Sequence, residues 1–198
     1  MEGILFQNKY RVPSARLTGF DYSRDGYYFV TICTKYRIEC FGSIMDAKMG
    51  LSLLGLATDE CWRAIPKHFP FVRLDEYIIM PNHVHGILEI YNNVGNVETQ
   101  NVASHTPTET QNVASLRHDK PYKNKFGPQS KNISSIIRGF KIGVTKYAHQ
   151  NGIPFMWQER FYDRIIRDER ALYKIRQYII ENPAKWWRDR NNSSHMFM

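Results

Sequence analysis

The stretch between Val72 and Ile90 constrains the fold more than any other part of the sequence. It holds two apolar and β-branched runs, Val72–Met80 and His83–Ile90, which are separated only by a Pro-Asn pair. Runs of this composition beside turn-forming residues are typical of a pair of strands. An earlier run, Gly26–Thr34, is rich in aromatic and β-branched residues and predicts a further strand. A β-sheet is therefore expected at the centre of the fold.

Helical spacing of apolar residues predicts three helices around this sheet. The segment from Pro154 to Arg167 mixes aromatic residues with arginines and predicts one more strand or a hairpin. A strand, a helix and a strand pair in this order predict an α+β fold. The helices are expected from Leu51 to about Pro66, from an Asn132 N-cap to about Ala148, and from an Asp168 N-cap through Glu169 to Glu181 or Asn182.

The composition limits the class of partner and the compartment. A formal net charge of +8 at pH 7 favours polyanions, nucleic acid first and an anionic membrane surface second, although a basic surface with no such partner is also compatible. Cys33, Cys40 and Cys61 show no C-x-x-C spacing, which argues against a disulfide framework and a cysteine zinc site. No apolar run approaches the roughly 18 residues of a spanning helix, so a soluble cytoplasmic protein is expected.

The chain of 198 residues fits one domain that carries an insertion. Between about 94 and 120 the composition changes to Asn, Thr, Ser, Gln and Val, and the sequence TQNVAS occurs twice, at 99–104 and 110–115. A short repeat with no apolar face is typical of a low-complexity loop and not of a solenoid. We therefore predict a single domain over 1–198 with an insertion at about 94–120.

The chain is most basic between Leu116 and Gln150, where eight Lys or Arg residues stand against one Asp. Arg138 and Lys141 are three apart in the predicted helix, so they share a face that the apolar residues leave open. This face either follows the phosphates of a nucleic acid or is the ordinary solvated face of an amphipathic helix.

Two histidines interrupt the apolar strand pair. His83 and His85 are two apart, so their side chains project from one face of the strand while Val84 and Gly86 occupy the other. Two neighbouring imidazoles form a metal-binding edge or a proton-transfer pair, and either use needs a third group from elsewhere. The alternative is a pair of ordinary hydrogen-bonded histidines. The spacing alone does not decide, because H-x-H also occurs in zinc sites, cupins and nucleotide hydrolases.

The last predicted helix supplies candidates for the third group. Tyr178 and Asn182 are four apart and so lie one turn apart on one helix face, although Pro183 disfavours helical geometry at Asn182. A phenol with a pKa of about 10 needs help to act as a nucleophile, and an amide oxygen can bind a hard cation. The combination suggests a divalent cation held by His83, His85 and Asn182, beside a tyrosine directed at a phosphate. The structural alternatives are a half-buried tyrosine and a C-capping asparagine.

Three stretches resemble one known family, the single-tyrosine HUH transposases of the IS200-like type, and in particular their REP-associated tyrosine transposase branch. The H-hydrophobic-H motif of these enzymes is matched by YIIMPNHVHGIL. Their first strand is similar to GFDYSRDGYYFVTICT, and their nucleophile helix to WQERFYDRIIRDERALYKIRQYIIENPAKW. The resemblance covers about Leu17 to Trp187 apart from the insertion. H-x-H is unspecific, whereas M-P-N-H-x-H with a downstream Y-I-x-x-N-P is specific.

This resemblance implies a ferredoxin-like (RRM-like) α+β domain whose antiparallel sheet carries the histidines. It implies His83 and His85 as the catalytic metal-binding pair, Tyr178 as the nucleophile, and Asn182 as a further ligand of Mg²⁺ or Mn²⁺. Family members cleave single-stranded DNA beside short hairpins through a 5′-phosphotyrosine intermediate and rejoin the ends. Single-stranded or hairpin DNA is therefore the expected partner, with a monomer favoured over a homodimer.

Basic and aromatic residues outside this set are candidates for contacts with DNA. Arginine and lysine would bind phosphates, and exposed aromatic rings would stack on unpaired bases. Trp157 is instead expected to pack in the core. The candidates are Arg138, Lys141, Arg160, Tyr162 and Arg164.

Two other functions compete with the transposase at this stage. In a histidine-based nucleotide hydrolase or phosphoesterase, one imidazole would attack a phosphate, but a third histidine that would favour this reaction is replaced by Ile87. A domesticated hairpin-DNA-binding protein would keep the fold and the binding without productive cleavage. The histidine pair together with Tyr178 favours activity, and formation of a covalent adduct distinguishes the three hypotheses.

Overall fold

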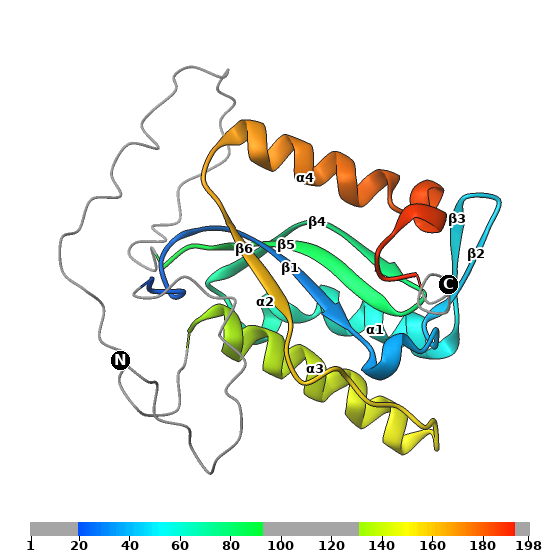
Figure 1. The fold of residues 1–198 in the computed structure, drawn as a ribbon. Coiled ribbons are helices and arrows are strands. Elements are labelled where there is room, and N and C mark those ends of the chain that lie inside the picture. Colours follow the sequence, from blue (N-terminus) through cyan, green and yellow to red (C-terminus); the bar gives the residue numbers. More distant parts are fainter. Residues whose placement is uncertain (1–19, 93–130, 193–198) are drawn as a thin grey trace, which may run out of the picture.

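Four strands form an antiparallel sheet at the centre of the molecule (Figure 1). The computed structural model describes residues 20–92 and 131–192. The strand order is β4-β5-β1-β6, and all three neighbouring pairs are antiparallel. The strands are β1 (Gly26–Cys33), β4 (Val72–Met80), β5 (His83–Ile90) and β6 (Tyr162–Ile166).

The connections between these strands give the topology. Helix α1 (Leu53–Arg63) lies between β1 and β4, and helix α3 (Ile133–Gln150) lies between β5 and β6, so that each connection passes over one intervening strand. This order of strand, helix, strand, strand, helix, strand is that of the ferredoxin-like split βαβ motif. The predicted α+β, ferredoxin-like fold is confirmed.

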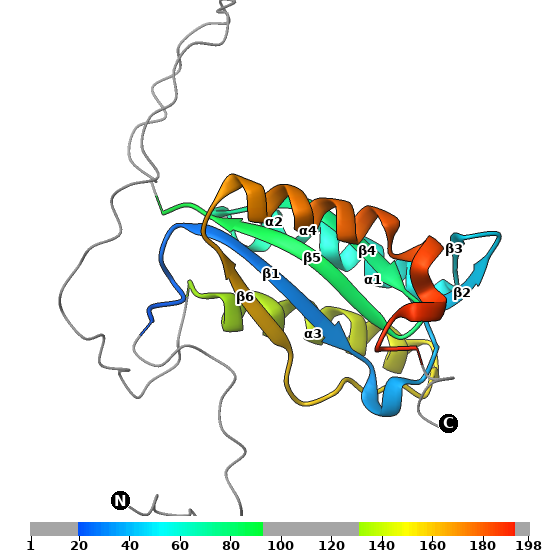
Figure 2. The same ribbon diagram turned by 45° about the horizontal axis from the view of Figure 1, so that its top comes forward.

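The helices cover the two faces of the sheet unequally (Figures 1 and 2). Helices α1, α2 (Ile65–His68) and α3 lie on one face, and α4 (Glu169–Glu181) lies alone on the other. Alternation along β1 fits this arrangement, since Val30 packs with the core under α1 and α3 whereas Phe29 packs with α4. The α4 face therefore has room for groups other than core side chains.

Capping residues define the beginnings of α3 and α4. The Asn132 side chain accepts a hydrogen bond from the Ser135 backbone N–H at 3.0 Å, and Asp168 accepts one from that of Ala171 at 2.7 Å. These bonds satisfy backbone donors that a helix leaves unpaired in its first turn. Both predicted N-caps are confirmed.

Two elements differ from the sequence expectation. The helix predicted to end at about Pro66 ends at Arg63, and Pro66 lies instead in the first turn of the separate helix α2, where a missing N–H is harmless. A small hairpin was not predicted, and its strands are β2 (Gly42–Met45) and β3 (Lys48–Leu51). Pro154–Arg167, expected to give a strand or hairpin, contributes the one strand β6.

Gly86 allows β5 to approach α1 closely. A Cβ atom at this position would lie 2.2 Å from Cζ2 of Trp62, which is fully buried under the sheet. Every other residue would therefore push β5 away from α1. Because Gly86 faces α1, its neighbour His85 faces α4.

The predicted insertion at about 94–120, with its two TQNVAS repeats, lies outside the described residues. Within the described ranges 20–92 and 131–192, no helix combines the length and the apolar character needed to cross a bilayer.

Candidate active site

The two histidines lie side by side on the α4 face of β5, as their spacing predicts. Their side chains are buried, and their ring centroids are 4.4 Å apart. Burial lowers the pKa of both imidazoles below the usual value, so both rings are neutral at pH 7. A neutral imidazole keeps a lone pair on one nitrogen, which is the form that binds metal ions.

Asn82 determines which nitrogen of His83 carries the lone pair. Its Nδ2 donates to the backbone oxygens of Arg37 and Asn191 at 3.0 and 2.8 Å. Its Oδ1 consequently faces His83 Nδ1 at 2.8 Å, and this bond requires an N–H on Nδ1. The lone pair is left on Nε2, which is buried and has no hydrogen-bond partner among the described residues.

His85 connects the sheet to α4. Its Nδ1 is 2.9 Å from Oγ1 of Thr31 on β1, and its Nε2 is 3.1 Å from the phenolic oxygen of Tyr178. Phe29 stacks on the imidazole with ring centroids 5.4 Å apart. When Nδ1–H donates to Thr31, Nε2 keeps a lone pair that accepts the Tyr178 hydroxyl.

Tyr178 reaches the histidines from the last turns of α4. Asn182 has φ −57° and ψ −42°, which is helical despite Pro183, so the predicted one-turn spacing is kept. Burial, and after it the charge of Asp189, raises the pKa of the Tyr178 phenol to about 12. The tyrosine is therefore protonated at neutral pH. Its side chain is 43% exposed, which leaves a path for a substrate.

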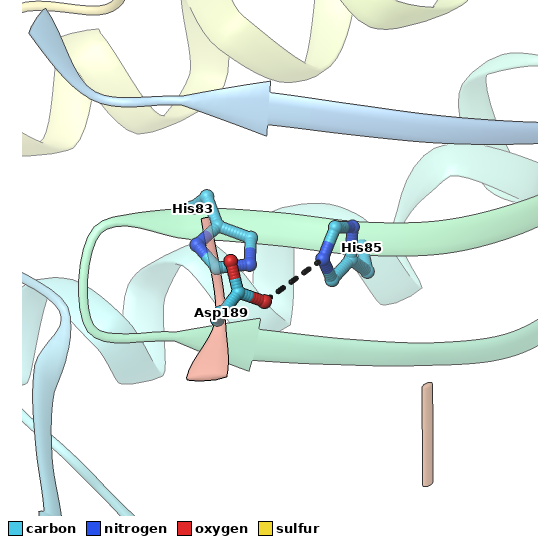
Figure 3. Close-up of side chains that lie close together, drawn as sticks. All are labelled: His83, His85 and Asp189. Atoms are coloured by element: carbon cyan, nitrogen blue, oxygen red, sulfur yellow. Dashed lines mark ion pairs between the residues drawn. The ribbon is translucent and has the colours of Figure 1, made fainter. Parts of the chain in front are cut away.

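Asp189 completes a cluster that the sequence did not reveal (Figure 3). It follows the short helix η3 (Pro183–Arg188) and is buried. Its Oδ2 lies 3.2 Å from Asn182 Nδ2, 3.5 Å from Tyr178 Oη and 3.9 Å from His85 Nε2. Two elements that follow each other in the sequence, α4 and η3, thus bring three side chains to the histidines.

The Asp189 carboxyl is ionised in this position. Burial opposes the charge, but the His85 imidazole and the backbone N–H of Asn191 lower the pKa of Asp189 well below its ordinary value. At 3.9 Å the contact between His85 Nε2 and Asp189 Oδ2 is longer than a hydrogen bond, and the closer donors to the carboxylate are the Asn191 backbone N–H at 2.6 Å and Asn182 Nδ2 at 3.2 Å. In the sequence Asp189 stands between two arginines, a pattern typical of a solvated surface, and no motif marks it.

The cluster provides ligand atoms for a divalent ion. One atom from each of His83, His85 and Asp189 lies within 4.8 Å of the others. Asn182 Oδ1, like His83 Nε2, is buried without a hydrogen-bond partner among the described residues. The two imidazole nitrogens suit transition metals, and the carboxylate and amide oxygens suit harder cations such as Mg²⁺ or Mn²⁺. The residues present therefore fit a divalent metal ion.

An ion pair fixes α4 over the sheet. Arg176 Nε donates to Asp75 Oδ1 at 2.8 Å, and Nη2 contacts the other carboxylate oxygen. Asp75 belongs to β4, so this bidentate pair joins the edge of the sheet to the helix that carries Tyr178. Leu172 and Ile179 pack against the same face of the sheet.

Tyr162 and Arg164, two of the DNA-binding candidates, lie on β6 close to the site. The Tyr162 ring is 6.4 Å from that of Phe29, whose centroid is 6.2 Å from Tyr178. Arg164 pairs with Phe29 in the β1–β6 register and projects from the same face as Tyr162. Arg160 lies just before β6 and lines a pocket together with Tyr162.

Arg138 and Lys141 lie on α3, behind the sheet as seen from the histidines. Lys141 Nζ donates to the backbone oxygen of Gln158 at 2.7 Å and lies 5.7 Å from the Trp157 ring, and burial lowers its pKa. Trp157 packs against the core, as predicted. Lys141 thus holds the segment before β6 against α3, a contact that sequence spacing did not indicate.

Similarity to known proteins bears on the family and the fold of this chain. No family model matches the chain. An uncharacterized protein of Haemophilus influenzae is 39% identical over 180 residues, which cover 89% of this chain and 90% of that protein, so the two belong to one family. A second H. influenzae protein, named as a candidate REP-associated tyrosine transposase, is 24% identical over 165 residues, which cover 83% of this chain and 74% of that protein.

A solved structure of a REP-associated tyrosine transposase bound to a REP hairpin superposes with a TM-score of 0.52 at 15% identity, covering 90% of this chain and 74% of that one. The chain has the fold of the REP-associated tyrosine transposases. The resemblance predicted from the histidine and tyrosine motifs is thereby confirmed. Within the REP-associated tyrosine transposase fold, this chain places Tyr178 within hydrogen-bond distance of His85.

Proposed function

We propose that the protein is a metal-dependent single-stranded DNA transposase that cleaves and rejoins DNA beside a hairpin through a 5′-phosphotyrosine intermediate. The observation that carries this proposal is the position of Tyr178, whose phenolic oxygen lies 3.1 Å from His85 Nε2 within the His83, His85 and Asp189 cluster. A nucleophile beside a group of metal ligands is an arrangement that favours phosphoryl transfer.

The roles of the residues follow from their positions. His83, His85 and Asp189, with Asn182, would hold Mg²⁺ or Mn²⁺. The positive charge of such an ion would stabilise the negative charge on the phosphoryl oxygens as the phosphate is attacked. Asn82 and Thr31 hold the two imidazoles in their tautomers, so the ligand atoms stay aimed at the ion.

Tyr178 is proposed as the nucleophile. Its hydroxyl lies 3.1 Å from His85 Nε2 and 3.5 Å from Asp189 Oδ2, and with an ion bound at Nε2 the Asp189 carboxylate would be the remaining acceptor. Its oxygen forms a bond to phosphorus while the bond from phosphorus to the 3′ oxygen breaks. The proton that the phenol loses is balanced by the one that the departing 3′ oxygen gains. The ester conserves the bond energy needed for rejoining.

Hairpin DNA is the proposed substrate. The solved relative of this fold is bound to a REP hairpin. In this chain Tyr162 and Arg164 line the open face beside Tyr178, where an aromatic ring and a guanidinium suit an unpaired base and a phosphate. The net charge of +8 supports a polyanionic partner.

The test is incubation of the protein with a pool of labelled single-stranded hairpins and Mg²⁺ or Mn²⁺. A denaturing gel detects covalent adducts, and peptide mass spectrometry identifies the residue that carries DNA. We expect a metal-dependent adduct on Tyr178 that Tyr178→Phe abolishes. Tyr173→Phe is the matched control, because Tyr173 lies on the same helix and is 63% exposed, and this variant should form the adduct normally.

Each alternative has its own result in this test. An adduct that persists in Tyr178→Phe contradicts the assignment of the nucleophile. Hairpin binding by the wild-type protein with no adduct under any metal condition would favour the domesticated DNA-binding protein. A phosphohistidine on His83 or His85 would favour the histidine-based phosphoesterase.

A further inference from the structure

A second pocket lies beside the candidate active site, on the same face of the sheet. It has a volume of about 220 Å³ and lies between β1, the segment leading into β6, and the residues that follow Asp189. Thr31 and Cys33 form its floor, and Tyr162 forms part of its wall. Thr31 also contacts His85 Nδ1, so one side chain separates the pocket from the cluster.

The pocket is strongly basic. Arg37, Arg160 and Arg190 line it, and no Asp or Glu is among its lining residues. Guanidinium groups that line one small pocket attract an anionic ligand. Guanidinium binds phosphate through paired N–H donors, so the charge and the donor type both indicate a phosphate group.

Arg37, which lines the pocket, and its neighbour Tyr36 have a backbone conformation of high free energy. Tyr36 and Arg37 have φ values of 57° and 56°, in the left-handed region that residues with a Cβ rarely adopt. The Arg37 side chain is bound to Asn191 Oδ1, and its backbone oxygen accepts from the Asn82 amide that orients His83. The segment that positions Arg37 is therefore built jointly with the metal ligands.

A partly exposed aromatic ring lines the pocket. Tyr162 is 41% exposed, and the Arg190 guanidinium lies over its ring at 5.7 Å. A ring beside guanidinium groups matches a nucleotide unit, in which a base and a phosphate are a few ångströms apart.

We propose that this pocket binds a backbone phosphate of the DNA strand that neighbours the phosphate attacked by Tyr178. The inference rests on the proposed function for the identity of the strand. Arg160 and Arg190 contact the phosphate, and Tyr162 stacks on the adjoining base. Binding there sets the register of the strand, so that one phosphodiester reaches Tyr178 and the next is held by arginine.

The salt dependence of binding tests this proposal without any catalysis. Fluorescence anisotropy measures the affinity for a labelled oligothymidylate in metal-free buffer, between about 50 and about 200 mM salt. Each phosphate contact contributes a slope of about 0.7 for a single strand. We expect Arg190→Ala and Arg160→Ala each to lower the slope by about 0.7 and to weaken binding about tenfold at low salt.

Arg170→Ala is the matched control. Arg170 is an exposed arginine in the first turn of α4, at the end of the helix away from Tyr178, and its loss removes the same charge. It should leave both slope and affinity close to those of the wild type. Circular dichroism and thermal unfolding confirm that each variant is folded.

Three results would overturn the phosphate pocket. These are equal slopes for the two pocket variants and the wild type, an equal loss in Arg170→Ala, and no binding of the oligothymidylate by the wild type. A failure of adduct formation would leave this measurement unaffected, because no metal is present and no bond is cleaved. The proposed function and the phosphate pocket can therefore fail separately.

Discussion

Asn82 determines the chemistry of His83 without being a metal ligand itself. Because its amide nitrogen is bound to two backbone oxygens, its own oxygen must accept the Nδ1 proton of His83. The imidazole is therefore fixed in both orientation and tautomer before any ion binds. Loss of an outer residue of this kind typically lowers metal affinity about tenfold to about a hundredfold.

We expect Asn82→Ala to weaken Mn²⁺ binding by about tenfold to about a hundredfold, because the His83 ring loses the acceptor that holds it. Isothermal titration calorimetry measures the affinity. Thr58→Ala is the control, since it also removes a buried side-chain hydrogen bond but lies on α1, away from the cluster. Equal Mn²⁺ affinity in Asn82→Ala and the wild type would show that His83 does not depend on Asn82.

Asp189 is the one anionic side chain among the cluster residues, so its charge should matter more than its shape. We expect Asp189→Asn, which keeps the size and removes the charge, to weaken Mn²⁺ binding about tenfold or more. Glu169→Gln removes an exposed charge at the far end of α4 and should bind Mn²⁺ normally. Unchanged titration curves for Asp189→Asn would exclude the carboxylate from the ion's ligands.

At the scale of elements, the proposed reaction depends on the position of α4, which carries Tyr178. Its contacts with the sheet are the apolar side chains Leu172 and Ile179 and the bidentate pair between Arg176 and Asp75. The Arg176 guanidinium has the largest effect and lowers the pKa of the Asp75 carboxyl. Burial raises this pKa, and the backbone N–H of Glu76 lowers it. The folded state therefore favours the ionised carboxylate.

Arg176→Gln is expected to lower the free energy of unfolding by about 1 kcal/mol near neutral pH. A lowered carboxyl pKa in the folded state adds stability above the ordinary value of 3.8, and this contribution is lost as the pH falls through the lower folded value. The difference between variant and wild type should therefore shrink in acid. Urea unfolding at several pH values measures this difference in the free energy of unfolding. Arg63→Gln, which removes the ion pair with Asp59 on the surface of α1, is the control. A difference that stays constant with pH would contradict the ion-pair explanation.

Local patterns predicted most elements because periodicity and caps are local properties. The runs Val72–Met80 and His83–Ile90 coincide with β4 and β5, and both capped helices begin where Asn132 and Asp168 place them. The β2–β3 hairpin escaped notice because its strands have four residues each, too few for a clear alternation.

In the candidate site, too, local sequence patterns predicted some residues and missed others. His83, His85, Tyr178 and Asn182 stand in recognisable spacings, and the structure brings them together. Asp189 and the orienting role of Asn82 depend on where the chain after α4 folds back onto the sheet, and that is a tertiary property. No local pattern in the sequence carries it.

At the scale of the whole molecule, one chain supplies every group of the cluster. Tyr178 reaches the histidines of its own sheet, and α4 is held on that sheet by contacts within the chain. A protein that exchanged this helix with a partner would instead need two chains to complete a site. The expected monomer stays a prediction.

Mixing two variants that each lack a different part of the site tests this expectation. His83→Ala keeps the tyrosine, and Tyr178→Phe keeps the metal ligands, so exchanged helices would restore one complete site in a mixed dimer. We expect the mixture to form no covalent adduct with hairpin DNA. Light scattering after size-exclusion chromatography gives the mass independently. Recovery of the adduct in the mixture would show that chains exchange α4.

The buried atoms His83 Nε2 and Asn182 Oδ1, which lack hydrogen-bond partners among the described residues, also bear on how firmly the protein stays folded. An unsatisfied buried polar group costs about 1 to 3 kcal/mol, and a bound ion would relieve two of them at once. Linkage then predicts about 2.7 kcal/mol of added stability when the ion is at a hundred times its dissociation constant, seen as a higher melting temperature with Mn²⁺ and a lower one with a chelator. Depletion of the ion would thus loosen the fold as well as empty the cluster.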